Sequence, residues 1–267
     1  GVFEFAHRER ERASRLMAAI SKADSTPSPI LKSLRIQGRI IHAILMREII
    51  TRYGRHNIGF AWMFAEPMMF TLGIVLIWSL SHEFNGHYGI DIASYAITGY
   101  STILIWRNTI GRCADSVEPN RSLLFYRNVK VVDVFISRCL LEIMGITLST
   151  LLIFAIFIFT NFIATPYDFL RMAEAWFFLC WYSTAMGMII GALTEMSDIA
   201  EKVCHPLAYF QLPVSGAFVK NAWLPESMRS IVLIFPVSQC TDLFRSGYYG
   251  PSVTVYFSRN YVMGCCF

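Results

Sequence analysis

Charged side chains are scarce in this sequence. Asp, Glu, Lys and Arg together make up 16% of its 267 residues, whereas an ordinary soluble domain has about 25%. Hydrophobic residues make up 55% and aromatic residues 15%. A soluble fold of this length cannot hide so much apolar surface from water. The shortage of charge therefore excludes an ordinary soluble domain and indicates an integral membrane protein.

Several patterns typical of enzymes and secreted domains are also missing. No GxxxxGK[ST] segment occurs, so we expect that this chain does not bind or hydrolyse ATP through a phosphate loop. The seven cysteines lack the regular spacing of a disulfide framework and include no CxxC pair for zinc. His82 and His87 are five positions apart, whereas a zinc protease helix needs four. We therefore expect no metal, cofactor or catalytic site in this chain.

The first sixty residues are polar and basic, which argues against a signal peptide and leaves membrane insertion to the later apolar segments. The sequence begins at Gly1 without Met and stops at Phe267 inside an apolar run, so we expect both native ends to lie beyond it. Residues 1–29 are predicted to form a charged cytoplasmic extension that ends in a break containing Pro27 and Pro29.

Residues 30–61 are predicted to form an amphipathic interface helix, helical to about Tyr53. Four basic residues recur at steps of three and four, so they share one face, and four apolar residues fall on the opposite face. A basic helix of this kind, just before a membrane span, usually lies in the plane of the membrane interface. The basic residues are Lys32, Arg35, Arg39 and His42, and the apolar residues are Ile30, Leu34, Ile41 and Leu45.

Residues 62–267 are predicted to form an all-α transmembrane domain with six spans, because a span needs about 20 mostly apolar residues. The fifth span contains Pro206 and Pro213 and should be kinked or broken. Residues 228–239 are too few to cross a bilayer and are interrupted by Pro236, which favours a re-entrant element. The predicted spans are residues 62–80, 93–106, 139–163, 172–193 and 203–219, with a truncated sixth that begins near residue 253.

The basic residues of the polar segments predict the orientation. Residues 1–61 hold eleven Lys and Arg and residues 107–138 hold six, whereas residues 81–92 hold none and residues 164–171 hold one. Cytoplasmic loops carry the excess of Lys and Arg. We therefore expect a multi-pass protein with both termini in the cytoplasm. Asn120 heads an Asn-x-Ser glycosylation pattern, but it falls on this cytoplasmic side, so the match is interpreted as accidental.

Two acidic residues of the spans invite a functional and a structural interpretation. Glu66 lies near the start of the first span, where an ionisable group is costly and marks a functional site by default. The alternative is a shallow position in which Glu66 pairs with Arg52, Arg55 or another cation of the interface. Glu142 has a local partner in Arg138, one helical turn earlier, which favours a structural role.

Cationic and aromatic residues near the span ends also have two interpretations. Arg107 and Arg112 are either interface anchors or a cationic vestibule for an anionic substrate. The aromatic residues either face lipid or line a sugar pathway by stacking on pyranose rings. The candidates for a substrate entrance and pathway are Arg52, Arg55, Trp62, Glu66, Trp106 and Arg107.

Four segments resemble the membrane subunits of capsule polysaccharide exporters, which are permeases of the ABC-2 type. The resemblance extends from about residue 30 to the end, and the segments occur in the order found in that family. Asp242 departs from the family pattern, in which Glu is expected at this position. The segments are LMREIITRYGRHNIGFAWMFAEP (45–67), LLFYRNVKVVDVFISRCLLE (123–142), PVSGAFVKNAWLP (213–225) and FRSGYYG (244–250).

The resemblance implies a permease in the inner membrane of a Gram-negative bacterium, surrounded by membrane lipids. It implies a homodimer that pairs with two separate ATPase subunits, which bind the ATP and Mg. Lipid-linked capsular polysaccharide would be the substrate. A periplasmic co-polymerase and an outer-membrane exporter would complete the route, and no nucleic acid is expected to bind.

The resemblance also assigns roles to segments. In this family the interface helix and the loop after the second span dock on the ATPase, and short re-entrant helices, here about residues 227–245, close the outer side. The implied ATPase-docking residues are Arg35, Arg39, Arg121, Arg127 and Lys130, and the implied outer-gate residues are Pro236, Asp242 and Arg245.

Three other functions remain open from the sequence. A permease for O-antigen or teichoic acid would share the predicted topology. A membrane-embedded glycan or lipid transferase would need carboxylates grouped at one membrane face, and the cluster of Glu195, Asp198 and Glu201 is the candidate for such a group. A scaffold that only anchors an ATPase would need its docking surfaces but not the interior of its spans.

Overall fold

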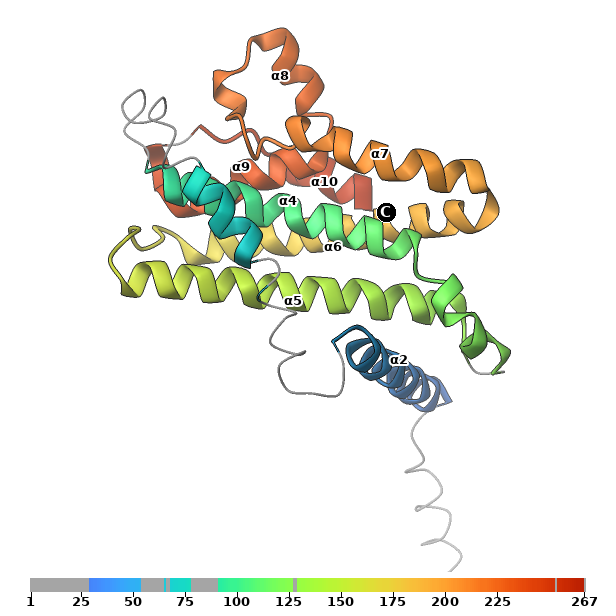
Figure 1. Cartoon of the computed structure of the whole chain (residues 1–267). Helices are drawn as coiled ribbons and strands as arrows, with labels where there is room; N and C mark the ends of the chain where they lie inside the picture. Colours follow the sequence, from blue (N-terminus) through green and yellow to red (C-terminus); the bar gives the residue numbers. More distant parts are fainter. Residues whose placement is uncertain are drawn as a thin grey trace, which may run out of the picture. The chain divides into compact units, whose positions relative to one another are not determined.

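The structure is a computed structural model that describes residues 29–53, 65, 68–77, 91–126, 129–252 and 254–266. Throughout these residues the regular elements are helices and no strand occurs, in agreement with the predicted all-α class (Figure 1). The chain divides after Ile40 into two parts, residues 1–40 and 41–267, and each is described by itself.

Helix α2 spans Pro29–Tyr53 and matches the predicted helix of the interface segment. Its first part does not bury the predicted apolar stripe, because Ile30 and Leu34 are both exposed. In its second part, which belongs to residues 41–267, the buried positions are Ile44 and Glu48. A carboxylate therefore occupies one of the buried positions of the helix, which the sequence pattern did not predict.

The second predicted span is longer than expected. Helix α4 spans Ile92–Ala114 and begins where the Asp91 side chain accepts a hydrogen bond from Ser94 N at 3.0 Å, a typical N-cap. It continues two turns beyond the predicted end at Trp106, so Arg107 and Arg112 are helical. The short 3-10 helix η2, Glu118–Phe125, follows in the basic segment. The short apolar helix Met68–Ile77 lies inside the first predicted span, most of whose other residues are outside the described part of the chain.

Two long helices form the next pair. Helix α5 spans Val131–Phe159 and begins eight residues before the predicted third span, because Asp133 Oδ2 accepts from Lys130 N at 2.9 Å and closes the helix start there. Helix α6 spans Phe169–Met196 and begins at Asp168, whose side chain accepts from two backbone N–H groups of the first turn. Both starts follow from capping, which the hydropathy pattern does not record.

The fifth predicted span has the expected length, but it begins and ends five residues earlier. Helix α7 spans Asp198–Val214, continues through Pro206 and ends one residue after Pro213. The helix is therefore not broken at Pro206, and a kink there stays a prediction. After it come the 3-10 helix η3, Asn221–Trp223, and helix α8, Glu226–Val232. Pro213 ends the helix because a proline lacks the N–H that the helix ladder needs.

Helix α9 spans Pro236–Tyr249 and is the most buried element, since every residue except Tyr249 is buried. The predicted apolar element at residues 228–239 is therefore two helices, exposed α8 and buried α9, with a turn between them. Pro236 starts α9 rather than interrupting a helix, because proline is favoured in a first helical turn. The 3-10 helix η4 spans Gly250–Ser252, and α10 spans Arg259–Cys266, six residues later than the predicted start of the sixth span.

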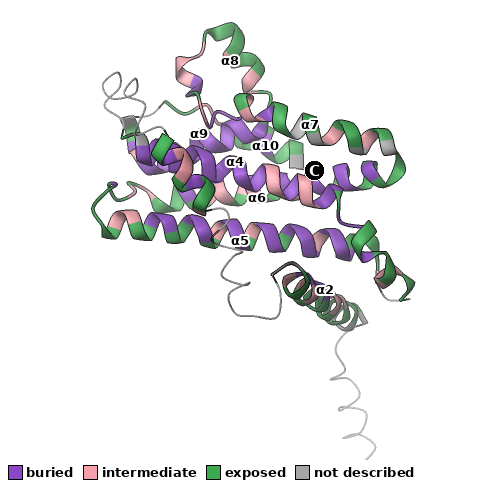
Figure 2. Ribbon diagram, viewed as in Figure 1, coloured by how far each residue is buried: buried purple, intermediate pink, exposed green. Residues whose placement is uncertain are grey.

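Helix α6 is the centre of the packing, because it contacts α4, α5, α7, α9 and α10. Figure 2 shows buried residues along α4, α5, α6 and α9, most densely on α9, whereas α7 and α8 are largely exposed. The aromatic pairs Trp106–Tyr182 and Trp176–Phe244 join these helices, with ring centroids 5.2 Å and 5.4 Å apart. A helix as polar as α9 can be this buried because its backbone and side-chain groups find partners in neighbouring segments.

Two described helices are long and apolar enough to cross a membrane, namely α5 and α6, with mean hydropathies of 2.3 and 1.5 over their most apolar windows. Length and composition of two helices are weak evidence by themselves, since a buried core helix can pass the same test. The predicted count of six spans and the re-entrant path of α8 and α9 therefore remain predictions.

Candidate functional site

A buried polar network connects the second part of α2 with η2 and α5. We call it the Glu48 network, and it consists of Arg47, Glu48, Asn120 and Arg138. Asn120 donates to Glu48 Oε1 at 2.6 Å and accepts from Arg47 Nη1 at 3.0 Å. Arg138 forms an ion pair with Glu48 Oε2 at 3.1 Å. Glu48, Asn120 and Arg138 are all buried, so the network links three elements without help from solvent.

The ion pairs of this region differ from the local pair that the sequence predicted. Arg138 pairs with Glu48 of α2, and Glu142 pairs with Arg112 of α4 at 3.5 Å. Each member of the predicted pair is therefore bound to another element as well. The ion pair between Glu142 of α5 and Arg112 of α4 agrees with the structural role expected for Glu142. The sequence did not predict this pair, because the two residues lie on different helices.

Asn120 is the residue that the sequence interpretation missed. It is buried, and a third hydrogen bond from its side chain reaches Ser116 O at 2.9 Å. Glycosylation would attach a sugar to Asn120 Nδ2, the buried nitrogen that donates to Glu48 and to Ser116 O. The position of Asn120 inside the basic segment was visible in the sequence. Its partners in α2 were not, because they are more than 70 residues away in the chain.

The predicted ATPase-docking residues are exposed where the structure describes them. Arg35 and Arg39 are exposed on the first part of α2, and Arg121 and Lys130 are exposed on and after η2. Arg127 lies outside the described residues. Arg121 is next to Asn120, so the Glu48 network fixes the backbone from which this exposed cation projects.

The predicted outer-gate residues lie together in α9 and are all buried. Arg245 is fully buried, and its guanidinium carbon lies 3.8 Å from the centroid of the Tyr95 ring of α4. The same guanidinium donates to Gly216 O and Ala217 O, both at 2.5 Å. A cation held between an aromatic face and two carbonyls is favourable in a desolvated site.

Asp242 and Asn221 extend this arrangement, and we call Tyr95, Asn221, Asp242 and Arg245 the Arg245 cluster. Asn221 Nδ2 donates to Asp242 Oδ2 at 2.8 Å and to Ser238 Oγ at 2.7 Å. The cluster therefore fastens residues 216–221, the connection between α7 and α8, onto α4 and α9. Tyr95 and Asn221 were not singled out from the sequence, although Asn221 lies within one of the four resembling segments.

Lys220 is the second cation near this cluster. It is buried, and its ammonium lies 5.9 Å from the Trp223 ring centroid. Burial lowers the pKa of Lys220, the Arg245 charge lowers it further, and the Asp242 charge opposes both effects. The cluster thus places two cations and one carboxylate at the connection between α7 and α8.

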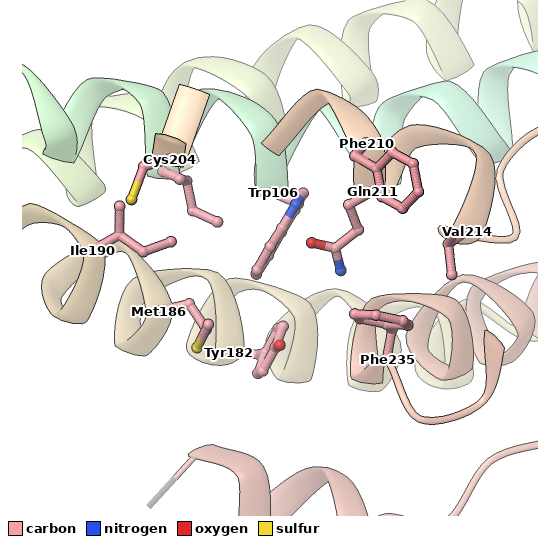
Figure 3. Close-up of a pocket in the computed structure, with 10 residues that line it drawn as sticks. Trp106, Tyr182, Met186, Ile190, Cys204, Phe210, Gln211, Val214 and Phe235 are labelled. Atoms are coloured by element: carbon pink, nitrogen blue, oxygen red, sulfur yellow. The ribbon is translucent and has the colours of Figure 1, made fainter. Parts of the chain in front are cut away.

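A cavity of about 150 Å³ lies among α4, α6, α7 and the turn before α9. In Figure 3 the Trp106 indole stands between one group of residues, Met186, Ile190 and Cys204, and another that includes Gln211 and Phe235. Tyr182 also lines the cavity, and its ring stacks on Trp106 at an angle of 11°. The walls are largely apolar and aromatic.

One of the predicted pathway residues lines this cavity, and a second is its neighbour in the sequence. Trp106 is one of its walls, and the neighbouring Arg107 is half-buried with its guanidinium 5.8 Å from the Tyr209 ring centroid on α7. The side chains of Arg52, Arg55, Trp62 and Glu66 lie outside the described residues, so their predicted roles stay predictions. The structure brings Trp106 and Arg107 to the junction of α4 and α7.

Within the described ranges no three His, Cys, Asp or Glu residues come together as a metal site. His82 and His87, as well as the side chains of Asp198 and Glu201, lie outside those ranges. The expectation that the chain holds no metal therefore remains a prediction, as does the interpretation of the acidic cluster.

Comparison with known proteins defines the class to which this helical architecture belongs. The family of ABC-2 type transporters matches residues 39–249, a stretch that contains the Glu48 network, the cavity and the Arg245 cluster. The chain belongs to the ABC-2 type transporter family. Membership makes it a transport permease rather than an enzyme.

The similar proteins narrow the class further. The chain is 40% identical over 234 residues to the capsule polysaccharide export inner-membrane protein BexB of Haemophilus influenzae, which covers 87% of each chain. It is 38% identical over 234 residues to the protein CtrC of the same description from Neisseria meningitidis serogroup B, covering 88% of each. It is 25% identical to the polysialic acid transport protein KpsM of Escherichia coli, over 85% of this chain and 88% of the other.

Proposed function

We propose that this chain is the transmembrane permease subunit of an ATP-driven exporter that moves lipid-linked capsular polysaccharide across the inner membrane of a Gram-negative bacterium. The similar proteins are named for capsule polysaccharide export and polysialic acid transport. These names favour capsular glycan over O-antigen or teichoic acid as the substrate. The given sequence contains no phosphate loop, which supports our proposal that ATP and Mg bind to a separate subunit.

The exporter is a homodimer of this chain with two ATPase subunits, and it works with a periplasmic co-polymerase and an outer-membrane exporter. The chain crosses the membrane several times, and both termini are cytoplasmic. The excess of Lys and Arg in residues 1–61 and 107–138 supports this orientation.

The observation that carries the proposal is the Glu48 network. It joins the second part of α2 to η2 and α5 through three buried polar side chains. These are the segments that the family resemblance assigns to ATPase docking. Because breaking a buried ion pair costs free energy, the network keeps α2 in contact with η2 and α5 when the ATPase binds to them. Arg121 and Lys130 then present positive charge from this support to an ATPase surface.

Charge reversal of the exposed cations tests the docking surface. Arg121→Glu and Lys130→Glu should each weaken association with the ATPase, because complementary charge becomes like charge across an interface. Association is measured by the amount of ATPase that co-purifies with the tagged permease. We expect the double variant to retain less than about a tenth of the wild-type amount, the result of losing about 1.4 kcal/mol or more of binding free energy.

Arg171→Glu is the matched control, since Arg171 is also an exposed arginine but lies at the start of α6, in the predicted outer loop. This variant should co-purify the ATPase as the wild type does. If the Arg121 and Lys130 variants bind the ATPase normally, these residues are not docking contacts. If the wild-type chain binds no ATPase at all, the proposed function is wrong.

A further inference from the structure

Two buried hydrogen-bond donors line the cavity beside Trp106. The indole nitrogen of Trp106 and the amide nitrogen of Gln211 are both buried, and among the described residues neither has a hydrogen-bond partner. Trp106 is 3% exposed and Gln211 is 9% exposed, so bulk water does not compensate for the missing partners. Native proteins satisfy nearly all buried polar groups. Two exceptions in the wall of one cavity therefore require an explanation.

The position and chemistry of the two donors indicate which kind of ligand the cavity would bind. In Figure 3 the Gln211 amide lies between Trp106 and Phe235, toward the interior of the cavity. An N–H group can only donate, and the Gln211 NH2 has two protons to donate. The matching ligand must therefore carry acceptor oxygens. The rest of the wall is aromatic and aliphatic, including Tyr182, Met186 and Phe235, so the ligand must also have an apolar face.

A sugar ring meets both requirements. Its hydroxyl and ring oxygens accept hydrogen bonds, and its C–H face packs against aromatic side chains. A hydrocarbon chain would fill the apolar part but leave both donors unsatisfied, which costs free energy in a buried site. Ordered water would satisfy the donors but would gain little from the aromatic walls.

We propose that this cavity is a subsite for one sugar ring of the exported glycan, with Trp106 and Gln211 as hydrogen-bond donors to its oxygens. The inference deepens the proposed function and rests on it, because that function supplies the glycan. Arg107 lies beside Trp106 and over the Tyr209 ring of α7, so the subsite borders a cationic surface suited to an anionic glycan.

The test is binding of a defined glycoside to the purified full-length chain in detergent. The probe is methyl β-D-glucopyranoside, titrated while saturation-transfer NMR measures its binding. Trp106→Phe keeps an aromatic ring but removes the indole N–H, and Gln211→Met keeps the side-chain length but removes the amide. Each variant should weaken binding by about fivefold to tenfold, the effect of one lost hydrogen bond.

Trp176→Phe is the matched control, because its indole nitrogen donates to Thr147 Oγ1 at 2.9 Å and Trp176 does not line the cavity. This variant should bind the glycoside as the wild type does but unfold at a lower temperature. Trp106→Phe and Gln211→Met should unfold at the same temperature as the wild type or a higher one without ligand, since each removes an unsatisfied buried donor. Opposite effects on stability thus separate a ligand site from a structural hydrogen bond.

Cyclohexanemethanol, a ring of similar size with a single oxygen, tests the apolar alternative. If it binds as tightly as the glycoside and the two variants do not change its binding, the cavity is an apolar site and the proposal is wrong. If both cavity variants unfold at a lower temperature and no glycoside binds, ordered water occupies the cavity and the proposal is also wrong. A chain that co-purifies its ATPase but fails this test overturns the sugar subsite alone.

Discussion

Gly99 lies where α4 meets α9 and the connection after α7. A methyl group at this position would overlap the carbonyl oxygen of Ala217 and the guanidinium of Arg245. These two groups are hydrogen-bonded to each other, so neither can move away without straining the bond that fastens the connection. Gly99 therefore sets how closely α4 approaches the Arg245 cluster.

Gly99→Ala should destabilise the protein by about 1–3 kcal/mol, the usual cost of overpacking a tight contact. The measurement is the midpoint of thermal unfolding of the purified chain in detergent. Gly111→Ala is the control in the same helix, because nothing lies within 4 Å of a methyl group there. It should leave stability unchanged or raise it by up to about 1 kcal/mol, since alanine favours helix over glycine. Equal stability of the two variants would contradict the close approach at Gly99.

Single residues show which features of the candidate site could be predicted from the sequence. Pro236, Asp242 and Arg245 were predicted to act together, and they do lie on one buried helix. Tyr95 was missed because its contact with Arg245 joins positions 150 residues apart in the chain. The glycosylation pattern at Asn120 was interpreted as accidental, but its structural role was not predicted, because its hydrogen bonds to α2 depend on the folded structure. Residue type and local spacing predict candidates, but tertiary contacts decide their partners.

At the scale of elements, the Glu48 network connects α2, η2 and α5 through buried hydrogen bonds and an ion pair. Glu48→Gln removes the negative charge opposite Arg138 but keeps an acceptor for Asn120. Since breaking a buried ion pair costs about 3–5 kcal/mol, we expect a lower unfolding temperature. In the complex with the ATPase we also expect less glycan exported for each ATP hydrolysed, because the docking segments are less firmly joined. Unfolding is followed by heating, and coupling by measuring export and phosphate release together.

Glu174→Gln is the control for this variant. It removes an ion pair with Arg259 whose side chains are partly exposed, at 30% and 62%, and exposed pairs contribute about 1 kcal/mol at most. This variant should keep both stability and coupling. An unchanged ratio of export to ATP hydrolysis in Glu48→Gln, in a protein that folds, would show that the network is not part of the coupling.

The elements also show which features the sequence could predict. The positions of α2, α5 and α6 were expected from apolar periodicity and run length, and they are present. The ends of α4, α5 and α6 were predicted less accurately, because Asp91, Asp133 and Asp168 fix the helix starts by capping and hydropathy takes no account of a cap. The burial of α9 could not be predicted, since its sequence is polar and its burial depends on hydrogen bonds to neighbouring segments.

At the scale of the whole molecule, the chain combines helices packed around α6 with a buried network that joins the segments proposed to dock on an ATPase. It has no phosphate loop in its sequence, and its family consists of transporters. Membership of this family implies an ATPase partner, which is the energy source that we propose. The same reasoning separates it from a transferase, which would act without ATP, and from a scaffold, which would not need the cavity beside Trp106.

Reconstituted transport tests the central claim most directly. The purified permease is placed in lipid vesicles with lipid-linked capsular glycan, with or without the ATPase from the same organism, and glycan accessible on the opposite face is measured. We predict movement of the glycan only when the permease, the ATPase and ATP with Mg are all present. Movement without the ATPase or without ATP, or chemical change of the glycan by the permease alone, would contradict the account.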